Sequence, residues 1–382
     1  MKYPNKRKTE KLANYLYEKA MAFYSQNDTT IEPEKALYYL IRAAEMEHPK
    51  AMALIAMLYY EGLGVEKNYN KSFEWATRAV QTESAEAYHI MSILYSEGKG
   101  VEQNLAKAFE FAEKSAINDY TLGQNQLGVF YAKGIGVEKD EKQAFHWYKK
   151  SADNGYKEAM YNLAFCYLNG LGTNEDFKKA IFYFEKSAKL GSAESQFILG
   201  KIYYDGEGLE SDKVKAIELF DKAAEQGQKD AQYALAVCYN QGIIKEENHS
   251  KAVEWFKKAA EQGHSAAQFE LGYCYDMGIG IEKNSAEAIK LYELSAVKRN
   301  PGAIFMLSYH YHKGECVTKN PQKAVAYLKE AAELNHPIAQ YNLGVWYKEG
   351  EELPQDLVKA KYWLHKSSEN GYQEATDLLK QM

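Results

Sequence analysis

Cysteine and histidine are the residue types that could carry chemistry in this chain, and their spacing indicates no reactive centre. The cysteines form neither a CxxC pair nor a metal-ligand spacing; they are Cys166, Cys238, Cys274 and Cys316. We predict that the first three are small core hydrophobes and that Cys316, in a turn, is an exposed thiol. His310 and His312 are two residues apart on a predicted helix, so their side chains face different sides and make a poor metal pair.

Motifs of enzymes are missing as well. The sequence contains no G-x-S-x-G, Walker loop, HExxH or dinucleotide fingerprint. We therefore predict no catalytic residue, cofactor or metal, although a site built from distant residues would leave no such motif. The net charge of -6 gives no reason to expect nucleic acid as a partner. With no apolar run near about 18 residues and no signal segment, we expect no membrane insertion and a cytoplasmic location.

A repeat of 36 residues organises the chain. We name its most regular residue the anchor glycine, and it recurs without insertion at Gly62, Gly98, Gly134, Gly170, Gly206, Gly242, Gly278, Gly314 and Gly350. A tyrosine stands three residues before each anchor, a large aliphatic residue seven before, and a small residue six before. Because residues four apart share one face of a helix, this pattern predicts a helix that ends at the glycine, here called helix A.

A second helix, helix B, is predicted to start after each anchor. Asn or Asp, which are preferred N-caps, stands six residues after every anchor: Asn68, Asn104, Asp140, Asp176, Asp212, Asn248, Asn284, Asn320 and Asp356. The pattern extends one unit toward the N-terminus and begins another helix A near the C-terminus. We therefore predict an all-α chain of about ten helix pairs, with a cap at about 9–25, repeats over about 15–372 and a last helix at about 373–381.

These motifs resemble the Sel-one-like repeat family, a relative of the tetratricopeptide repeat. AMYNLAFCYLNGLGT at 159–173, AQFELGYCYDMGIGI at 267–281 and AVEWFKKAAEQG at 252–263 carry the resemblance. It implies one right-handed α/α superhelix, a solenoid, over 1–382, and the role of an adaptor that binds proteins. The cysteine pairs of one bacterial branch are missing, so functions known in that branch are not carried over. At Ile244, Cys316 and Glu352, where the second glycine of the motif is replaced, we expect turns of different shape or rigid variants.

Aromatic residues on helix A mark the predicted binding surface. In the tetratricopeptide fold the corresponding stripe lines a concave groove, and by that resemblance we expect a groove here that holds a peptide or protein. Aromatic anchors with polar neighbours are typical of such interfaces. The predicted contact residues are Tyr161, Phe197, Tyr204, Tyr233, Phe269, Tyr273, Phe305, Tyr309, His312 and Tyr341. Rings nine residues before the anchor could equally pack between helices, and this alternative stays open.

The hypothesis that follows is a protein-interaction scaffold that is not an enzyme. Two alternatives remain at this point. One is a hydrolase acting on cell-wall material, and the other is a secreted bacterial effector or an antitoxin-like inhibitor that uses the same groove.

Overall fold

The computed structural model describes residues 6–24, 33–243 and 248–382, and the secondary structure in these ranges is entirely helical. Two compact units divide the chain, Met1–Ser195 and Gln196–Met382. The prediction of a single domain over 1–382 stays a prediction.

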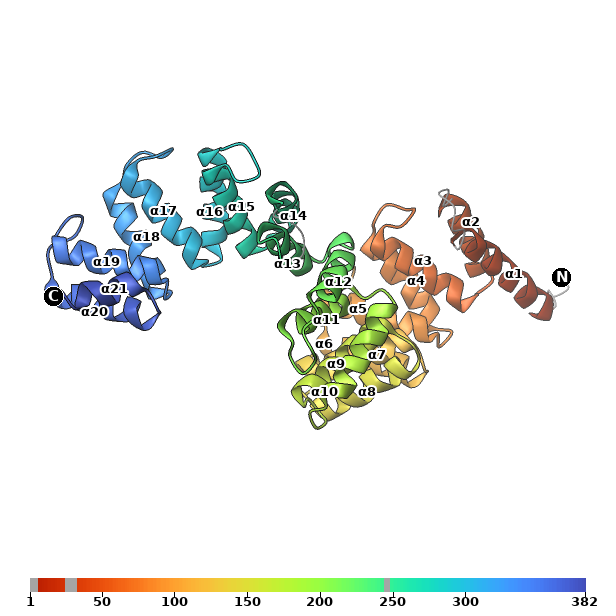
Figure 1. The fold of residues 1–382 in the computed structure, drawn as a ribbon. Helices are drawn as coiled ribbons and strands as arrows, with labels where there is room; N and C mark the ends of the chain where they lie inside the picture. The colour runs from red at the N-terminus through yellow and green to blue at the C-terminus, as the bar shows by residue number, and fades with distance from the viewer. Residues whose placement is uncertain (1–5, 25–32, 244–247) are drawn as a thin grey trace. The chain divides into compact units, whose positions relative to one another are not determined.

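The first unit contains ten complete helices (Figure 1). They are α1 (Lys6–Tyr24), α2 (Pro33–Ala44), α3 (Pro49–Glu61), α4 (Tyr69–Val80), α5 (Ala85–Glu97), α6 (Leu105–Ile117), α7 (Thr121–Lys133), α8 (Glu141–Asp153), α9 (Lys157–Asn169) and α10 (Phe177–Lys189). Odd-numbered helices are helices A and even-numbered helices are helices B. Each helix packs on the next one along the chain, as the repeat predicted.

The second unit continues the same alternation. Its helices are α11 (Ala193–Asp205), which begins at the end of the first unit, α12 (Lys213–Glu225), α13 (Lys229–Asn240), α14 (His249–Glu261), α15 (Ser265–Met277), α16 (Ser285–Val297), α17 (Pro301–Lys313), α18 (Pro321–Glu333), α19 (Pro337–Glu349), α20 (Leu357–Glu369) and α21 (Gln373–Leu379). Ten helix pairs and a final helix in the described ranges confirm the predicted count.

The predicted helix boundaries are confirmed except at the end of α13, whose C-cap is Gln241 rather than Gly242. All nine Asn and Asp N-caps accept a hydrogen bond from the backbone N–H three residues later. The anchor glycines take positive φ angles, from +60° at Gly242 to +78° at Gly314. Among the replaced second glycines, Cys316 keeps the left-handed backbone with φ +63°, so this turn retains its shape. Ile244 lies outside the described residues.

Small residues six positions before the anchor let helix B approach helix A. A Cβ added at Gly200 would lie 2.7 Å from the ring of Phe220, and one added at Gly272 would lie 2.8 Å from the ring of Tyr292. Both rings belong to the helix B of the same repeat, fourteen residues after the anchor. The glycines therefore let an aromatic ring of helix B pack directly against the backbone of helix A.

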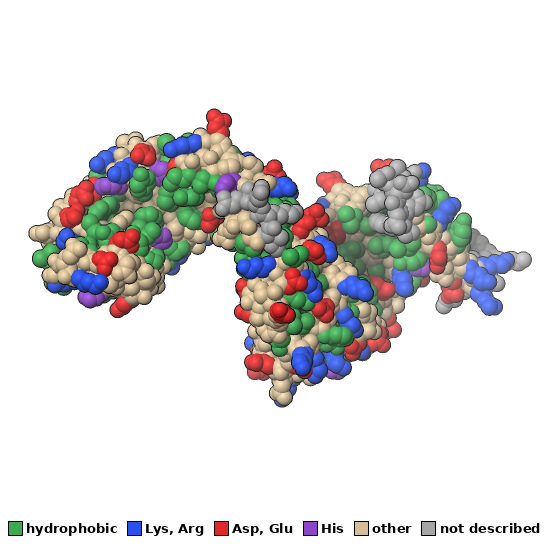
Figure 2. All heavy atoms as spheres, in the orientation of Figure 1, with side chains coloured by type: hydrophobic (Ala, Val, Ile, Leu, Met, Phe, Trp, Pro, Cys, Tyr) green, Lys and Arg blue, Asp and Glu red, His purple; other side chains and the backbone are tan. Residues whose placement is uncertain are grey.

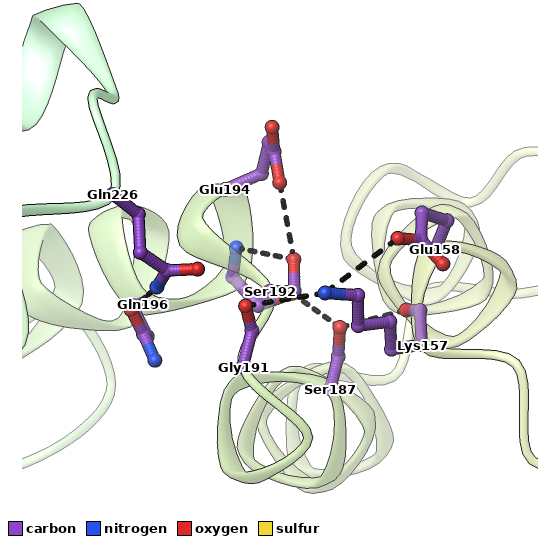
Figure 3. A network of polar contacts seen from close by, with 9 residues as sticks. Lys157, Glu158, Ser187, Gly191, Ser192, Glu194, Gln196 and Gln226 are labelled. Carbon is purple, nitrogen blue, oxygen red and sulfur yellow. Dashed lines mark hydrogen bonds and ion pairs between the residues drawn. The ribbon is translucent and has the colours of Figure 1, made fainter. Parts of the chain in front are cut away.

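Side-chain hydrogen bonds join neighbouring helices in several repeats. Ser187 of α10 donates to the carbonyl of Lys157 at the start of α9 (Figure 3). Ser195 of α11 donates to the Ser187 hydroxyl at 2.8 Å. In the second unit, Gln226 donates to the Gln196 side chain at 2.8 Å. These bonds satisfy buried polar groups and fix the position of one helix along the axis of its neighbour.

Candidate functional site

A pocket of about 460 Å³ lies between α11 and α13 in the second unit. We call it the open pocket. Its floor is the buried ring of Phe220 from α12. The complete lining is Phe197, Lys201, Tyr204, Asp205, Phe220, Asp230, Tyr233, Ala234, Val237, Cys238 and His264. Three of the predicted contact residues, Phe197, Tyr204 and Tyr233, therefore meet in one cavity.

The first unit has a pocket of about 270 Å³ in the same place of its repeat, between α7 and α9. Tyr148 of α8 takes the floor position that Phe220 has in the second unit. Tyr161 and Phe165 line this smaller pocket, and Phe165 is 39% exposed. The two pockets thus occupy the same place of the repeat, a groove between two successive helices A with a ring of helix B beneath it.

The rings nine residues before the anchor are half-buried rather than free. Tyr233 stacks on His264 with ring centroids 4.6 Å apart, and Phe305 stacks on His336 at 4.8 Å. Both histidines also cap the next helix A, because each Nδ1 accepts a backbone N–H. Burial lowers the pKa of both imidazoles, which keeps that nitrogen free to accept. Both rings thus pack against the cap of the next helix A, and Tyr233 also lines the open pocket.

The remaining predicted residues differ in exposure. Tyr273 and Tyr309 are 37% and 40% exposed, while Phe269, His312 and Tyr341 are half-buried. Phe269 packs against Tyr292, and Tyr341 packs against Tyr372. Figure 2 shows hydrophobic side chains gathered over the helices of the second unit, between patches of both charges.

An ion pair fills the corresponding place between α15 and α17, which we call the ion-pair seam. His310 Nε2 lies 3.0 Å from Asp276 Oδ2, and the two side chains are only 2% and 8% exposed. His310 Nδ1 lies 3.3 Å from the carbonyl oxygen of Glu315. Since both ring nitrogens contact acceptors, the imidazole has no free nitrogen to act as a general base.

Both histidines of α17 therefore have a carboxylate partner. His312 Nδ1 lies 3.1 Å from Oε1 of Glu352, off the line of a hydrogen bond, and its ring packs near Trp346. Sequence reasoning missed Asp276 and Glu352 because each lies in a neighbouring repeat. A signal was available for His310, which is the one polar side chain at a position that is otherwise apolar or cysteine, four residues before the anchor.

The cysteines follow the prediction. Cys166, Cys238 and Cys274 are buried, and Cys316 is exposed. Burial raises the pKa of each buried thiol to about 11. Within the described ranges, His, Cys, Asp and Glu side chains form no group able to hold a metal ion. Of the helices described, none has both the length and the apolar character that crossing a bilayer needs.

Ten consecutive segments match the Sel1 repeat: residues 11–48, 49–81, 85–120, 121–156, 157–192, 193–228, 229–264, 265–296, 301–336 and 337–372. The chain belongs to the Sel1 repeat family. This Sel1 repeat protein is similar to c5321, described as a protective antigen of uropathogenic Escherichia coli with an SLR fold. The identity is 30% over 97% of this chain and 80% of that one, and the TM-score is 0.72.

A second solved structure, a Sel1 repeat protein from Oxalobacter formigenes, shares 25% identity with this Sel1 repeat protein. The match covers 78% of this chain and 87% of that one, with a TM-score of 0.57. No curated protein resembles the chain closely enough to count as a match. The Sel1 repeat is typically a protein-interaction scaffold without enzymatic activity, and the family thus supports a binding role in general terms.

Proposed function

We propose that this Sel1 repeat protein is a scaffold that binds a peptide segment of a partner protein in the groove between successive helices A. The observation that carries the proposal is the open pocket, where aromatic rings from two successive repeats surround about 460 Å³. Concave pockets with apolar walls and a few polar groups are the usual form of a binding site. The ten predicted contact residues are the proposed contacts.

Exposed rings beyond the pocket extend the proposed contact surface. Tyr273 of α15 and Tyr309 of α17 leave more than a third of their surface to solvent. Tyrosine gives a large contact area, loses little conformational entropy on binding, and is enriched in binding hot spots. An extended segment or an amphipathic helix would fit such a row of rings.

The test uses a displayed library of random dodecamer peptides selected on the full chain. Enriched peptides are then measured against Tyr204→Ala, Tyr273→Ala and Tyr309→Ala. We expect at least one of these variants to weaken binding about tenfold, which corresponds to about 1.4 kcal/mol. Helix content and melting temperature should stay near those of the wild type.

The matched control is Tyr362→Ala, which removes a 51% exposed ring from α20, outside the groove. Peptides that keep their affinity for all three groove variants would contradict the proposal. An equal loss with the control variant would do the same, because it would show a general effect of removing exposed rings.

A further inference from the structure

Three helices A begin at a histidine whose imidazole acts as the capping group. His48, His264 and His336 are the N-cap residues of α3, α15 and α19. In each case Nδ1 accepts the backbone N–H three residues later, at 3.1 Å, 3.1 Å and 3.2 Å. Because a backbone nitrogen only donates, Nδ1 of each imidazole carries no hydrogen, and each ring is neutral.

Each of these imidazoles also contacts the preceding helix A. Tyr17 of α1, Tyr233 of α13 and Phe305 of α17 stack on the three histidines, with ring centroids 4.7 Å, 4.6 Å and 4.8 Å apart. A proton on Nδ1 would place two hydrogens face to face, one on the imidazole and one on the amide. The cap bond is then lost, whether the ring flips within the stack or leaves it.

The charged neighbours of His264 come from two elements. On α13, Asp230 Oδ1 lies 3.4 Å from Nε2 and favours a proton on the ring, whereas Lys229 opposes it. Lys298, at the end of α16, opposes it as well. Burial is the largest effect, and the pKa of His264 lies below its ordinary value of 6.5. The folded protein therefore resists protonation of this cap.

The environment of His48 acts in the same direction. Burial lowers the pKa of this imidazole, and the charge of Lys50 lowers it further. The ammonium of Lys50 lies 4.0 Å from Glu86 of α5, and the titratable group stacked on the ring is Tyr17. His48 thus also stays neutral more readily than an exposed histidine.

His336 has a less charged surrounding than His264. Gly302 and Asn370 stand at the positions that Asp230 and Lys298 occupy two repeats earlier. Burial is the cause that lowers the pKa of His336. All three caps therefore share one response to acid, although their charged neighbours differ.

We propose that His48, His264 and His336 make the solenoid acid-sensitive: a proton on each Nδ1 ends the cap hydrogen bond and frees the first turn of a helix A. The unfolded chain takes up these protons near the ordinary pKa of 6.5, and the folded chain does so only at lower pH. The stabilisation by the caps is therefore complete above about pH 6.5 and is lost as pH falls through the lowered values.

The experiment follows amide hydrogen exchange of the full chain by NMR at pH 7.5 and at pH 5. Protection factors correct for the intrinsic effect of pH on exchange and report local opening. The amides of Ala51, Ala267 and Ala339 donate to the three imidazoles, and their protection should fall roughly fivefold at pH 5, the effect of losing one N-cap. Ala303 is the internal control, because its amide donates to the side chain of Asn300, which does not titrate.

Three variants assign the effect to the histidine. His264→Asn installs the capping side chain of α17 and should preserve the protection of Ala267 at both pH values, while Ala339 still loses its own. Asp230→Asn removes the carboxylate that favours the proton, so Ala267 should lose protection only at a lower pH. His146→Asn, at an exposed site on α8, is the matched control and should change neither amide.

An equal loss of protection at Ala267 and Ala303 would overturn the proposal, because it would show a general opening of the helices in acid. A loss at Ala267 that persists in His264→Asn would do the same, since no imidazole is left there. Unchanged protection of all three histidine-capped amides at pH 5 would show that these caps do not respond to acid.

Discussion

The open pocket and the ion-pair seam occupy the same place in two repeats of the second unit, yet they differ in content. At the open pocket the three corresponding residues are Tyr204, Phe220 and Cys238, and about 460 Å³ stays free between α11 and α13. At the ion-pair seam they are Asp276, Tyr292 and His310, and a buried ion pair joins α15 to α17. The same place of the repeat thus holds a cavity in one case and a buried contact between two side chains in the other.

Removal of one ion-pair partner should have the largest effect. His310→Ala leaves Asp276 buried and unpaired, which costs about 3–5 kcal/mol in the free energy of unfolding. Urea denaturation of the full chain measures it. Cys238→Ala, at the same position of the open pocket, should cost only about 1 kcal/mol. The double variant Asp276→Leu with His310→Leu should recover most of the loss. If His310→Ala costs no more than Cys238→Ala and the double variant recovers nothing, the buried pair is not what stabilises the contact between α15 and α17.

Filling the open pocket should affect binding rather than stability. Ala234→Leu adds a larger side chain to a wall with free volume beside it, so we expect about tenfold weaker binding of selected peptides, or about 1.4 kcal/mol, with little change in melting temperature. Ala326→Leu, at an exposed site on α18, is the matched control. Unchanged peptide affinity in the Ala234 variant would mean that the pocket is not used.

Glu270 of α15, a half-buried carboxylate, should make stability depend on pH. Because the pKa of Glu270 is raised above its ordinary value of 4.5, the folded state holds the proton more strongly than the unfolded state. This residue therefore lowers stability progressively as pH rises from about 4 through the raised pKa, and the penalty is complete above it. Glu270→Gln should raise the melting temperature more at pH 7.5 than at pH 4. Glu254→Gln, at an exposed site on α14, should show no such trend. An equal response of both variants would contradict the assignment of the pH dependence to Glu270.

The smallest expected effect is a difference between the cysteines of the two sites in their rate of reaction with a thiol reagent. The pKa of about 11 for Cys238 and for Cys274 leaves about one thiolate in a thousand at pH 8. Iodoacetamide should therefore modify the exposed Cys316 first, as peptide mass mapping would show. Cys238, in the wall of the open pocket, should follow before Cys274, and a bound peptide should slow Cys238 alone. Faster modification of Cys274 than of Cys238 would contradict the expectation that the open pocket gives the reagent easier access.

Most of the helical architecture could be read from local signals. The Asn and Asp N-caps, the left-handed anchor glycines and the buried cysteines involve only a few consecutive residues or one face of one helix, and all were predicted. The contact residues were harder to predict from the sequence. A ring nine positions before the anchor packs both on helix B of its own repeat and on the N-cap residue of the next helix A. Tyr233 shows the result, since it packs on Phe256 and His264 and also lines the open pocket.

By itself the sequence determined the repeat, the helix pairs and the family, because these depend on spacing along one chain. The pairing of His310 with Asp276, the partner of His312 and the raised pKa of Glu270 were decided only by the tertiary structure. Each depends on side chains from different repeats meeting across a helix contact. Burial then determines their charge and energy, and burial exists only once the helices have packed.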